Sequence, residues 1–268
     1  MMIKYDYHTH TSHSFDSNAS MKSMIERAIA IGLEEIAITD HIDFTWPECE
    51  IISPLGIAAN MKAIQAVWAK YAGKIKVLAG IELGLRPDLA EVGRKIVAEH
   101  DFDIVIGSAH EIDGIDFYYG HWYQGRPKHA AYMLYFENLL ATVQACDCYD
   151  VLGHLDYVER YGRYDDKSLH HGDYQEVIDE ILKTVIQKGK GIEINTSGYA
   201  NGLGHPHPQM PGIKRFVQLG GEVITVGSDA HAPGRIAGNF DDVYKILQSL
   251  GIKYITRFDK RHPQFVKI

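Results

Sequence analysis

Short apolar runs alternate along the chain with longer segments in which apolar residues recur every three or four positions. Strands of a parallel sheet are covered on both faces, so they read as continuous apolar runs. Runs of this kind occupy residues 3–7, 35–39, 76–81, 103–109, 150–153, 191–194 and 222–228. The helical pattern fills the intervals, at residues 20–31, 54–72, 87–100, 129–146, 173–189, 210–219 and 240–250.

Strand followed by helix, repeated along the chain, predicts an α/β fold with a parallel sheet. Because each crossover is right-handed, some seven such units close most simply into a barrel of the TIM type. A doubly wound open sheet is the alternative, but it usually carries a glycine-rich turn after the first strand, and here that turn is His-Thr-His-Thr-Ser-His. With 268 residues and 46% apolar content, we expect one domain over residues 1–268.

The predicted strands share one feature, which is that a polar or metal-binding residue stands where each of them ends. In a barrel these ends meet at one mouth, and in an extended segment residues i and i+2 point the same way. The residues are His8 and His10, Asp40 and His41, Glu82, His110, His154, Asn195, and Asp229 with His231. Imidazole and carboxylate ligands suit zinc, iron and manganese alike. The pattern therefore predicts a multinuclear metal site.

The formal net charge of −8 argues against a nucleic-acid polymer as the ligand, because such binding needs clustered Lys and Arg. Bound divalent ions would offset that charge locally and favour a small anionic substrate. The chain holds no run of about 18 apolar residues and enters a strand without a signal-peptide segment, so we expect a cytoplasmic protein that binds no membrane. Cys49, Cys146 and Cys148 have no spacing typical of disulfides or zinc sites.

Six short motifs resemble the polymerase and histidinol phosphatase (PHP) superfamily, and the resemblance spans nearly the whole chain. They are His8-Thr-His10, Thr39-Asp-His41, Gly80-Ile-Glu82, Gly107-Ser-Ala-His110, Gly153-His154 and Gly227-Ser-Asp-Ala-His231. Four longer segments narrow the resemblance to the monofunctional histidinol-phosphate phosphatases of that superfamily. These segments are residues 150–157, 160–162, 193–198 and 202–208.

The resemblance implies a distorted (β/α)7 barrel with three divalent ions, which are zinc, iron or manganese. Carried over by position, the ligands of the first ion would be His8, His10, Glu82 and Asp229. Glu82 would bridge to a second ion, which is also held by His110 and His154. The third ion would be held by Asp16, His41 and His231, with His13 as the alternative to Asp16.

The implied activity is hydrolysis of L-histidinol phosphate, with a metal-bound hydroxide as the nucleophile. Asp40, beside His41, is the carboxylate that we expect to accept a proton. Arg160 follows the fifth strand, where a guanidinium can grip two phosphoryl oxygens. The structural alternative for Arg160 is an ion pair with Glu159, Asp165 or Asp166.

The chain departs from the phosphatase pattern at Ala200, where many relatives carry an arginine. Arg235 is our candidate for replacing that charge, and the alternative is an ordinary surface arginine. His205 and His207 are expected to line the substrate pocket, or else to stiffen a long loop between prolines. Glu193 and Asn195 point the same way along their strand, so they either orient metal ligands or have a purely structural role.

Three other functions remain open at this stage. One is a related phosphoesterase for nucleotides or another small phosphate ester. Another is a non-catalytic, metal-holding module. The third is a C–N hydrolase of the amidohydrolase type, which would normally have a carbamate-forming lysine after a strand, and no strand end in this chain carries one. The sequence leaves the oligomeric state open.

Overall fold

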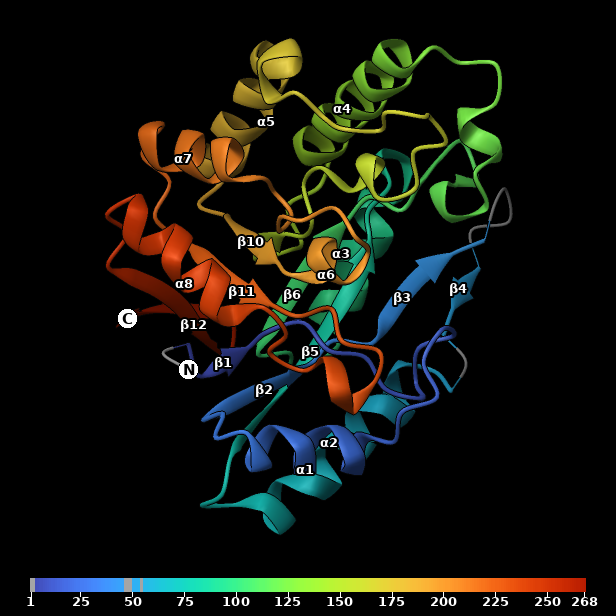
Figure 1. Cartoon of the computed structure of the whole chain (residues 1–268). Coiled ribbons are helices and arrows are strands. Elements are labelled where there is room, and N and C mark those ends of the chain that lie inside the picture. Colours follow the sequence, from blue (N-terminus) through green and yellow to red (C-terminus); the bar gives the residue numbers. More distant parts are fainter. Residues whose placement is uncertain (1–2, 46–49, 54) are drawn as a thin grey trace.

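A parallel sheet forms the centre of the molecule and closes into the predicted barrel (Figure 1). The computed structural model describes residues 3–45, 50–53 and 55–268. The strands run in the order β1 (Tyr5–Asp6), β2 (Glu35–Ile38), β5 (Lys76–Gly84), β6 (Ile104–Ser108), β9 (Val151–Leu152), β10 (Gly191–Asn195) and β11 (Ile224–Gly227). The last strand, β11, lies beside the first segment of the sheet. The backbone N–H of Tyr7 donates to the carbonyl of Val226 over 3.0 Å, and this hydrogen bond closes the barrel. The seven-stranded α/β barrel is therefore confirmed.

Helices follow the strands and bury one face each against the barrel, as their apolar spacing predicted. In α1, Ser20 caps the first turn by accepting from the backbone N–H of Ser23, and Met24, Ile25 and Ala28 are buried. Figure 1 shows α1 and α2 together on one side and α4, α5 and α7 on the other. The helices are α1 (Met21–Ala30), α2 (Ile57–Tyr71), α3 (Ala90–Ala98), α4 (Lys128–Ala145), α5 (Gln175–Gln187), α6 (Ser197–Ala200), α7 (Met210–Gln218) and α8 (Phe240–Ser249).

The barrel is distorted on the β5 side, where two strands share one neighbour. β5 pairs with β2 along its first half and with β3 (His41–Phe44) along its second half. His41 was predicted to lie beyond a strand end, but the chain resumes pairing after Asp40 and sets His41 opposite Glu82. The distortion therefore brings a histidine on one strand beside the carboxylate on the next.

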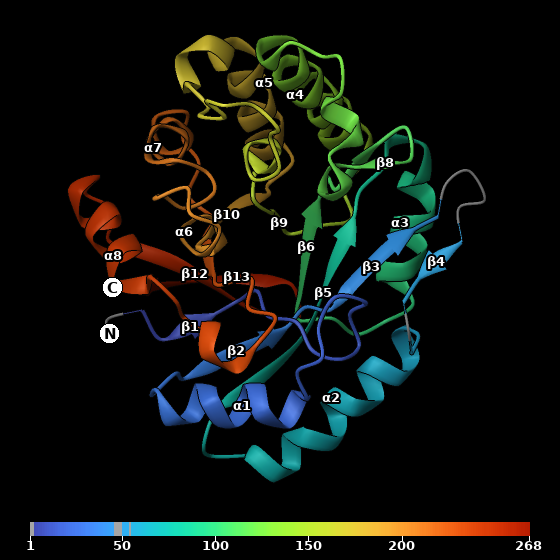
Figure 2. The same cartoon turned by 45° about the vertical axis from the view of Figure 1, so that its right-hand side comes forward.

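A C-terminal hairpin, β12 (Tyr254–Asp259) and β13 (His262–Lys267), closes the floor of the barrel and was not predicted. Figure 2 shows it in dark red, above β1 and β2. Its Phe258 is buried and donates its backbone N–H to the hydroxyl of Tyr7 over 2.9 Å. Phe258 packs in the barrel interior with Tyr7, Ala37, Leu78, Ile104, Ile106 and Val151. The hairpin therefore completes the core below the mouth.

Short elements complete the secondary structure around the mouth. They are the hairpins β3–β4 (Ile51–Ile52) and β7–β8 (Glu111–Ile112, Ile115–Asp116), and 3-10 turns at Pro87–Leu89, Phe117–Tyr119, His121–Tyr123, Tyr157–Glu159, His171–Tyr174 and Pro233–Arg235. Cys146 and Cys148 are buried free thiols, and Cys49 lies outside the described residues. In the described part of the chain, no helix has the length and apolar character needed to cross a bilayer.

Candidate metal centre

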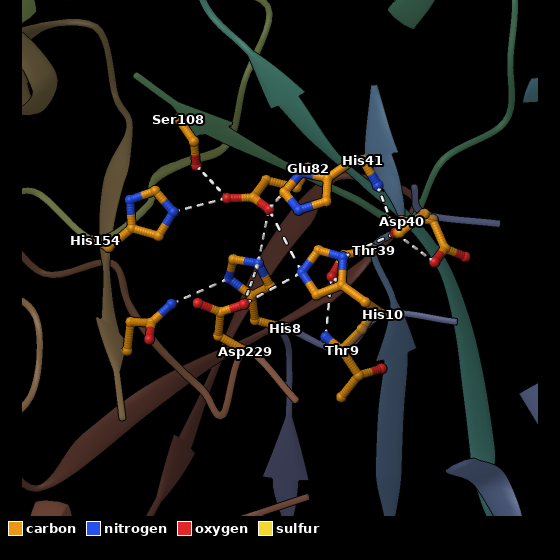
Figure 3. A network of polar contacts seen from close by, with 12 residues as sticks. His8, Thr9, His10, Thr39, Asp40, His41, Glu82, Ser108, His154 and Asp229 are labelled. Carbon is orange, nitrogen blue, oxygen red and sulfur yellow. Dashed lines mark hydrogen bonds and ion pairs between the residues drawn. The ribbon is translucent and has the colours of Figure 1, made fainter. Parts of the chain in front are cut away.

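Glu82, near the end of β5, lies at the centre of a buried cluster of histidines (Figure 3). Its side chain is 1% exposed, and its two oxygens face different groups of imidazoles. Oε1 lies 2.7 Å from Ser108 Oγ, 2.8 Å from His154 Nε2 and 3.1 Å from His110 Nε2. Oε2 lies 3.1 Å from His8 Nε2, 3.1 Å from His41 Nδ1 and 3.5 Å from His10 Nε2. One carboxylate therefore stands between two sets of metal-binding nitrogens.

Two further carboxylates complete the cluster. Asp229, after β11, has Oδ1 3.4 Å from His10 Nε2 and 3.8 Å from His8 Nε2. Asp16, in the first loop, has Oδ2 2.9 Å from His231 Nε2 and 3.5 Å from His41 Nε2. The structure thus brings together all of the residues that the sequence singled out as metal ligands: His8, His10, Asp16, His41, Glu82, His110, His154, Asp229 and His231.

Four of the histidines have Nδ1 held by an acceptor, which directs Nε2 toward the carboxylates. The Nδ1 partners are Glu193 Oε1 for His8 (2.6 Å), Ser14 Oγ for His10 (3.0 Å), Asp43 Oδ1 for His110 (3.0 Å) and the Asp229 carbonyl for His231 (2.9 Å). In metal sites the ligating histidine usually donates its other N–H to such a partner. The hydrogen bonding therefore prepares these rings for ligation through Nε2.

The donor set fits divalent metal ions. The Nε2 atoms of His8, His10 and His231 are buried and make no hydrogen bond of good geometry within the described residues. A buried nitrogen without a hydrogen-bond partner costs folding free energy unless a ligand binds it. The histidines and carboxylates fall into groups whose ligand atoms lie within 4.8 Å of one another, namely His8/His10/Glu82, Glu82/His110/His154, His10/His41/His231 and His41/Asp43/His110. Imidazole with carboxylate is a set that zinc, iron and manganese accept.

In the described residues, neither Asp16 nor its alternative His13 belongs to one of these four groups. Asp16 contacts two of the histidines, so the geometry favours Asp16.

The charges within the cluster are strongly coupled. Burial alone would raise the pKa of Glu82, but His8, His41 and His110 outweigh it and hold that pKa well below its usual range. Burial alone would lower the pKa of His231, but Asp16 and Asp229 outweigh it and raise the pKa to about 9. Without metal, Glu82 is therefore ionised at pH 7 while His231 carries a proton.

Metal loading of the metal-free protein at pH 7 is expected to release protons. A bound ion requires neutral imidazole, so ligation must displace the proton of His231, whose pKa is raised to about 9. The release should shrink as the pH rises through 9, where that proton is already lost. Zinc titration by calorimetry in buffers of different ionisation enthalpy measures the number. Zinc binding without any buffer dependence at pH 7 would contradict this account of the charges.

Asp40 does not have the expected position of a proton acceptor. Its side chain is buried, and both oxygens are occupied within the first loop. Oδ1 accepts from the Thr11 backbone N–H (2.5 Å) and from Ser14 Oγ (2.8 Å), and Oδ2 accepts from Thr11 Oγ1 (2.8 Å). Ser14 in turn accepts from His10 Nδ1. The geometry therefore makes Asp40 an anchor that orients His10 through Ser14, which corrects the sequence-based prediction.

Arg160 lies beside the metal cluster, with a partner that the sequence did not suggest. Its Nη1 lies 3.0 Å from Asp229 Oδ2 and 3.5 Å from Ser197 Oγ. The guanidinium also stands over the rings of Tyr157 and Tyr161, at 5.6 and 5.3 Å from their centroids. Its carboxylate partner is thus Asp229, rather than Glu159, Asp165 or Asp166. The ion pair that we considered as a purely structural alternative is instead formed with a residue of the cluster.

His205 and His207 were expected to line the substrate pocket, but they line neither of the two cavities beside the metal cluster. His207 is completely buried, with Nδ1 2.5 Å from Asp156 Oδ1, and its backbone pairs with Asn195 in both directions over 2.7 Å. His205 lies 3.5 Å from Glu159. The alternating prolines hold this segment extended, so it adds to the end of β10 and ties the loops after β9 and β10 together. Both histidines are therefore structural in this fold.

Two cavities adjoin the metal cluster and share Arg160 and His231. The first, which we call the arginine cavity, measures about 330 Å³ and is also lined by Ser197, Ala200, Asn201 and Arg235. The second, which we call the aromatic cavity, measures about 460 Å³ and is lined by Phe15, Asp43, Arg86, Glu111, Asp116, Tyr118, Tyr119, Tyr157 and Tyr161, among others. Arg235 and Ala200 therefore line the same cavity, as the replacement of a missing arginine requires.

Asp43 is a member of the cluster that was not among the predicted site residues. Its Oδ1 lies 3.0 Å from His110 Nδ1 and its Oδ2 lies 3.4 Å from His41 Nδ1. A side chain at position 84 would displace this carboxylate, because its Cβ would overlap Asp43 Oδ1, and Gly84 leaves that space free. The signal was present in the sequence, because His41-Ile-Asp43 repeats the i, i+2 spacing of His8 and His10. It was overlooked because residues 41–43 were not recognised as a strand.

Glu193 supports the cluster from β10 and offers a direct test of that support. The carboxylate is fully buried and accepts from His8 Nδ1, from Asn195 Nδ2 (3.1 Å) and from the His154 backbone N–H (3.2 Å). Glu193→Gln removes the charge behind His8 while keeping the side-chain size. We expect metal affinity to fall about 10- to 100-fold, as is typical for such partners. Competition with a chromophoric chelator measures this, and unchanged affinity would contradict the orienting role.

The fold and the cluster together define a class, the α/β-barrel proteins with a multinuclear metal centre at the mouth. The family model described as the PHP domain matches residues 6–197, which is well over half of the chain. The chain therefore belongs to the PHP family.

Relatives named as phosphatases match the chain over nearly its full length. It is 35% identical over 261 residues to the histidinol-phosphatase of Lactococcus lactis, covering 96% of this chain and 95% of that protein. It is 34% identical over 261 residues to a probable histidinol-phosphatase of Clostridium acetobutylicum, covering 96% and 97%. The crystal structure of the Lactococcus lactis histidinol phosphate phosphatase with zinc, L-histidinol and phosphate superposes with a TM-score of 0.90 at 32% identity, covering 97% of this chain and 98% of that one.

Proposed function

We propose that the protein is a metal-dependent phosphomonoesterase that hydrolyses L-histidinol phosphate to L-histidinol and phosphate. The observation that carries the proposal is the position of Glu82, whose two oxygens face separate sets of imidazoles beside two cavities. Similarity along the full chain to histidinol-phosphatases supports the choice of substrate. We also propose that residues 1–268 form one phosphatase domain. The enzyme is proposed to be cytoplasmic.

The proposed ligand sets are those that the family resemblance implies, and the contacts within the cluster support them. Glu82 bridges one ion, held with His8, His10 and Asp229, and a second ion, held with His110 and His154. Asp16, His41 and His231 hold the third. Zinc, iron or manganese bound there supplies Lewis acidity, which lowers the pKa of water and neutralises charge on phosphoryl oxygens.

The chain's own residues position the phosphate ester. Arg160 lies at the junction of the two cavities and carries a full charge, since Asp229 and the tyrosine rings raise its pKa despite burial. Its guanidinium can bind the phosphoryl oxygens next to the metal cluster. Arg235 lines the arginine cavity with Asn201 and Ser197, where it can supply the positive charge that an arginine at position 200 would provide. The leaving group would then lie in the aromatic cavity, which is large enough for a small molecule.

The other candidate functions fit the geometry less well. A nucleotide or other small phosphate ester needs the same phosphoryl site, so only the leaving-group cavity distinguishes these substrates. A non-catalytic module would not need Arg160 held beside the ligands at the junction of two cavities. A C–N hydrolase would normally place a lysine among the metal ligands, and the lining of both cavities contains no lysine among the described residues.

Phosphate release from a panel of esters tests the proposal. Protein purified without chelator and supplied with zinc, manganese or iron is assayed with L-histidinol phosphate, nucleotides and sugar phosphates. A clear preference for L-histidinol phosphate is expected. Preference for another ester would move the substrate assignment to that ester, and no phosphate release from any of them would refute the phosphatase function.

A further inference from the structure

Asp6, the last residue of β1, is a fully buried carboxylate outside the proposed ligand sets. Its Oδ1 accepts from the backbone N–H of Ser228 over 2.9 Å and from that of His8 over 3.4 Å. Its Oδ2 accepts from Ser228 Oγ over 2.6 Å and from the backbone N–H of Ala237 over 2.9 Å. Ser228 and Ala237 lie 222 and 231 residues away along the chain. One buried carboxylate therefore joins the first strand to two points of the loop after β11.

The segment between these two points, residues 228–237, carries three residues of the proposed site, and we call it the clasp loop. Asp229 and His231 belong to the proposed ligand sets, and Arg235 lines the arginine cavity. The first strand also holds the start of the loop, since the Asp229 N–H donates to the His8 carbonyl over 2.8 Å. Residues 232–235 are exposed or half-buried. The position of the loop therefore depends on how its two ends are held.

Both ends of the clasp loop have a left-handed backbone conformation. The φ angle is 54° at Asp229 and 53° at Ala237. This region is unfavourable for alanine because Cβ crowds the neighbouring carbonyl, whereas aspartate tolerates it better. Ile236 is buried, but the burial of that side chain does not determine the φ of the next residue. The hydrogen bond from the Ala237 N–H to the charged Asp6 side chain can outweigh the strain, because a charged acceptor binds about twice as strongly as a neutral one.

We propose that Asp6 is a positioning residue that holds the clasp loop in the conformation in which Asp229 and His231 meet the other metal ligands. Without its carboxylate, Ala237 relaxes to an ordinary backbone conformation and the return of the loop shifts with it. The inference rests on the ligand sets of the proposed function. It adds a residue outside those sets on which two of the three proposed ions depend.

Asp6→Asn is the first test, because asparagine keeps the size of the side chain but places a donor where the carboxylate accepts. Zinc-loaded, full-length protein is challenged with a chromophoric chelator, and the released ions are counted. The affinity for the ions held by the clasp loop should fall about 10- to 100-fold, as for other partners of metal ligands. The ion proposed for Glu82, His110 and His154 uses no residue of the loop and should keep its affinity. Unchanged affinity for all ions, or an equal loss for all of them, would contradict the proposal.

Ala237→Gly distinguishes positioning from a general loss of stability. Glycine adopts positive φ about as readily as negative φ, so it removes the strain that Asp6 otherwise holds in check. In the Asp6→Asn background, this second substitution should recover zinc affinity about three- to tenfold. In the parent protein it should change the affinity by less than about twofold, because the loop is already held. Equal effects in the two backgrounds would mean that Asp6 and Ala237 are not coupled, which would overturn the proposal.

Asp150→Asn is the matched control. Asp150 is a buried carboxylate that accepts from the backbone N–H of Val105 over 2.8 Å and from Arg261 Nη2 over 2.8 Å. It stands before β9, whereas the metal cluster stands after the strands. This variant should lower the melting temperature and keep the zinc affinity of the parent protein. Zinc binding weakened as strongly as in Asp6→Asn would mean that general stability, and not the position of the clasp loop, determines the affinity.

Hydrogen exchange tests the same contact without metal binding or phosphatase activity. The amide hydrogen of Ala237 is bound by Asp6, and in Asp6→Asn it should exchange at least about tenfold faster than in the parent protein. The amide hydrogen of Val105 should exchange at the same rate in both proteins. Failure of the phosphatase function would appear as absence of phosphate release by the parent protein and would leave this comparison intact. Equal exchange at Ala237 in the two proteins would refute the proposal.

Ser228→Ala replaces Asp6→Asn if the latter yields no folded protein. It removes the Ser228 hydroxyl, which is one of four donors to Asp6, and leaves the carboxylate in place. The affinity for the ions held by the clasp loop should then fall about threefold or more, the effect of one lost hydrogen bond. Unchanged affinity would count against the positioning role.

Discussion

Replacement of Glu82 by alanine is expected to abolish phosphate release and to strip metal from the protein. Both oxygens of this carboxylate face histidine clusters, so its loss affects two of the three proposed ions at once. Electrostatic help from metal ions is worth several kcal/mol, so activity should fall about 10³-fold or more. Metal content measured by inductively coupled plasma mass spectrometry should fall by at least one ion per chain.

Glu99→Ala provides the matched control for that experiment. Glu99 is exposed at the end of α3, so the same substitution there should keep full metal content and activity. Circular dichroism of both variants separates metal loss from unfolding. A folded Glu82→Ala protein with unchanged metal content would contradict the bridging position of this residue.

Replacement of Arg160 by alanine should lower kcat/KM about 10²- to 10³-fold, as for other groups that stabilise charge in the transition state. The guanidinium lies at the junction of the two cavities and is 3.0 Å from Asp229, so its loss removes the positive charge nearest the proposed phosphoryl position. KM should rise because phosphate binding weakens. Metal content should stay as in the parent protein, because Arg160 supplies no ligand atom.

Arg160→Lys separates charge from geometry in the same assay. Lysine keeps the charge but lacks the planar fork that binds two phosphoryl oxygens, so its activity should lie between those of the alanine variant and the parent. Unaltered kinetics in the Arg160→Ala protein that folds, combined with a poor yield of folded protein, would mean that the pair with Asp229 is only structural.

The barrel and the composition of the metal cluster were predictable because both follow from local rules. Continuous apolar runs separated by helices determine a parallel sheet, and the ends of its strands meet at one mouth. His8 and His10 share one strand direction, so their convergence needed no long-range information. The family resemblance then supplied Asp16, and its contacts with His41 and His231 agree with that choice.

The errors concern residues whose role depends on tertiary hydrogen bonds. Asp40 stands beside a ligand in sequence, but its oxygens are saturated by the first loop. His207 alternates with prolines like a pocket residue, but it pairs with Asp156 beneath the loops. Asp43 was missed because it lies on β3, a strand that was not predicted and that pairs with the second half of β5. None of these contacts has a local sequence signature, since each joins segments that are distant along the chain.

The C-terminal hairpin was missed for a related reason. Most residues of β13 are exposed, and β12 mixes apolar with charged positions, so the pair lacks the pattern of a buried strand. Its position is fixed by long-range contacts such as those of Phe258 with Tyr7 and of Arg257 with Glu35.

The central claim is that metal held by this cluster makes the protein a phosphatase for L-histidinol phosphate. The most direct test is to remove the metal, add back zinc or manganese in known equivalents and follow phosphate release from that ester. The account predicts no release from the metal-free protein and a rate that rises to a plateau at three equivalents per chain. Full activity in the metal-free protein, or no activity at any loading, would contradict it.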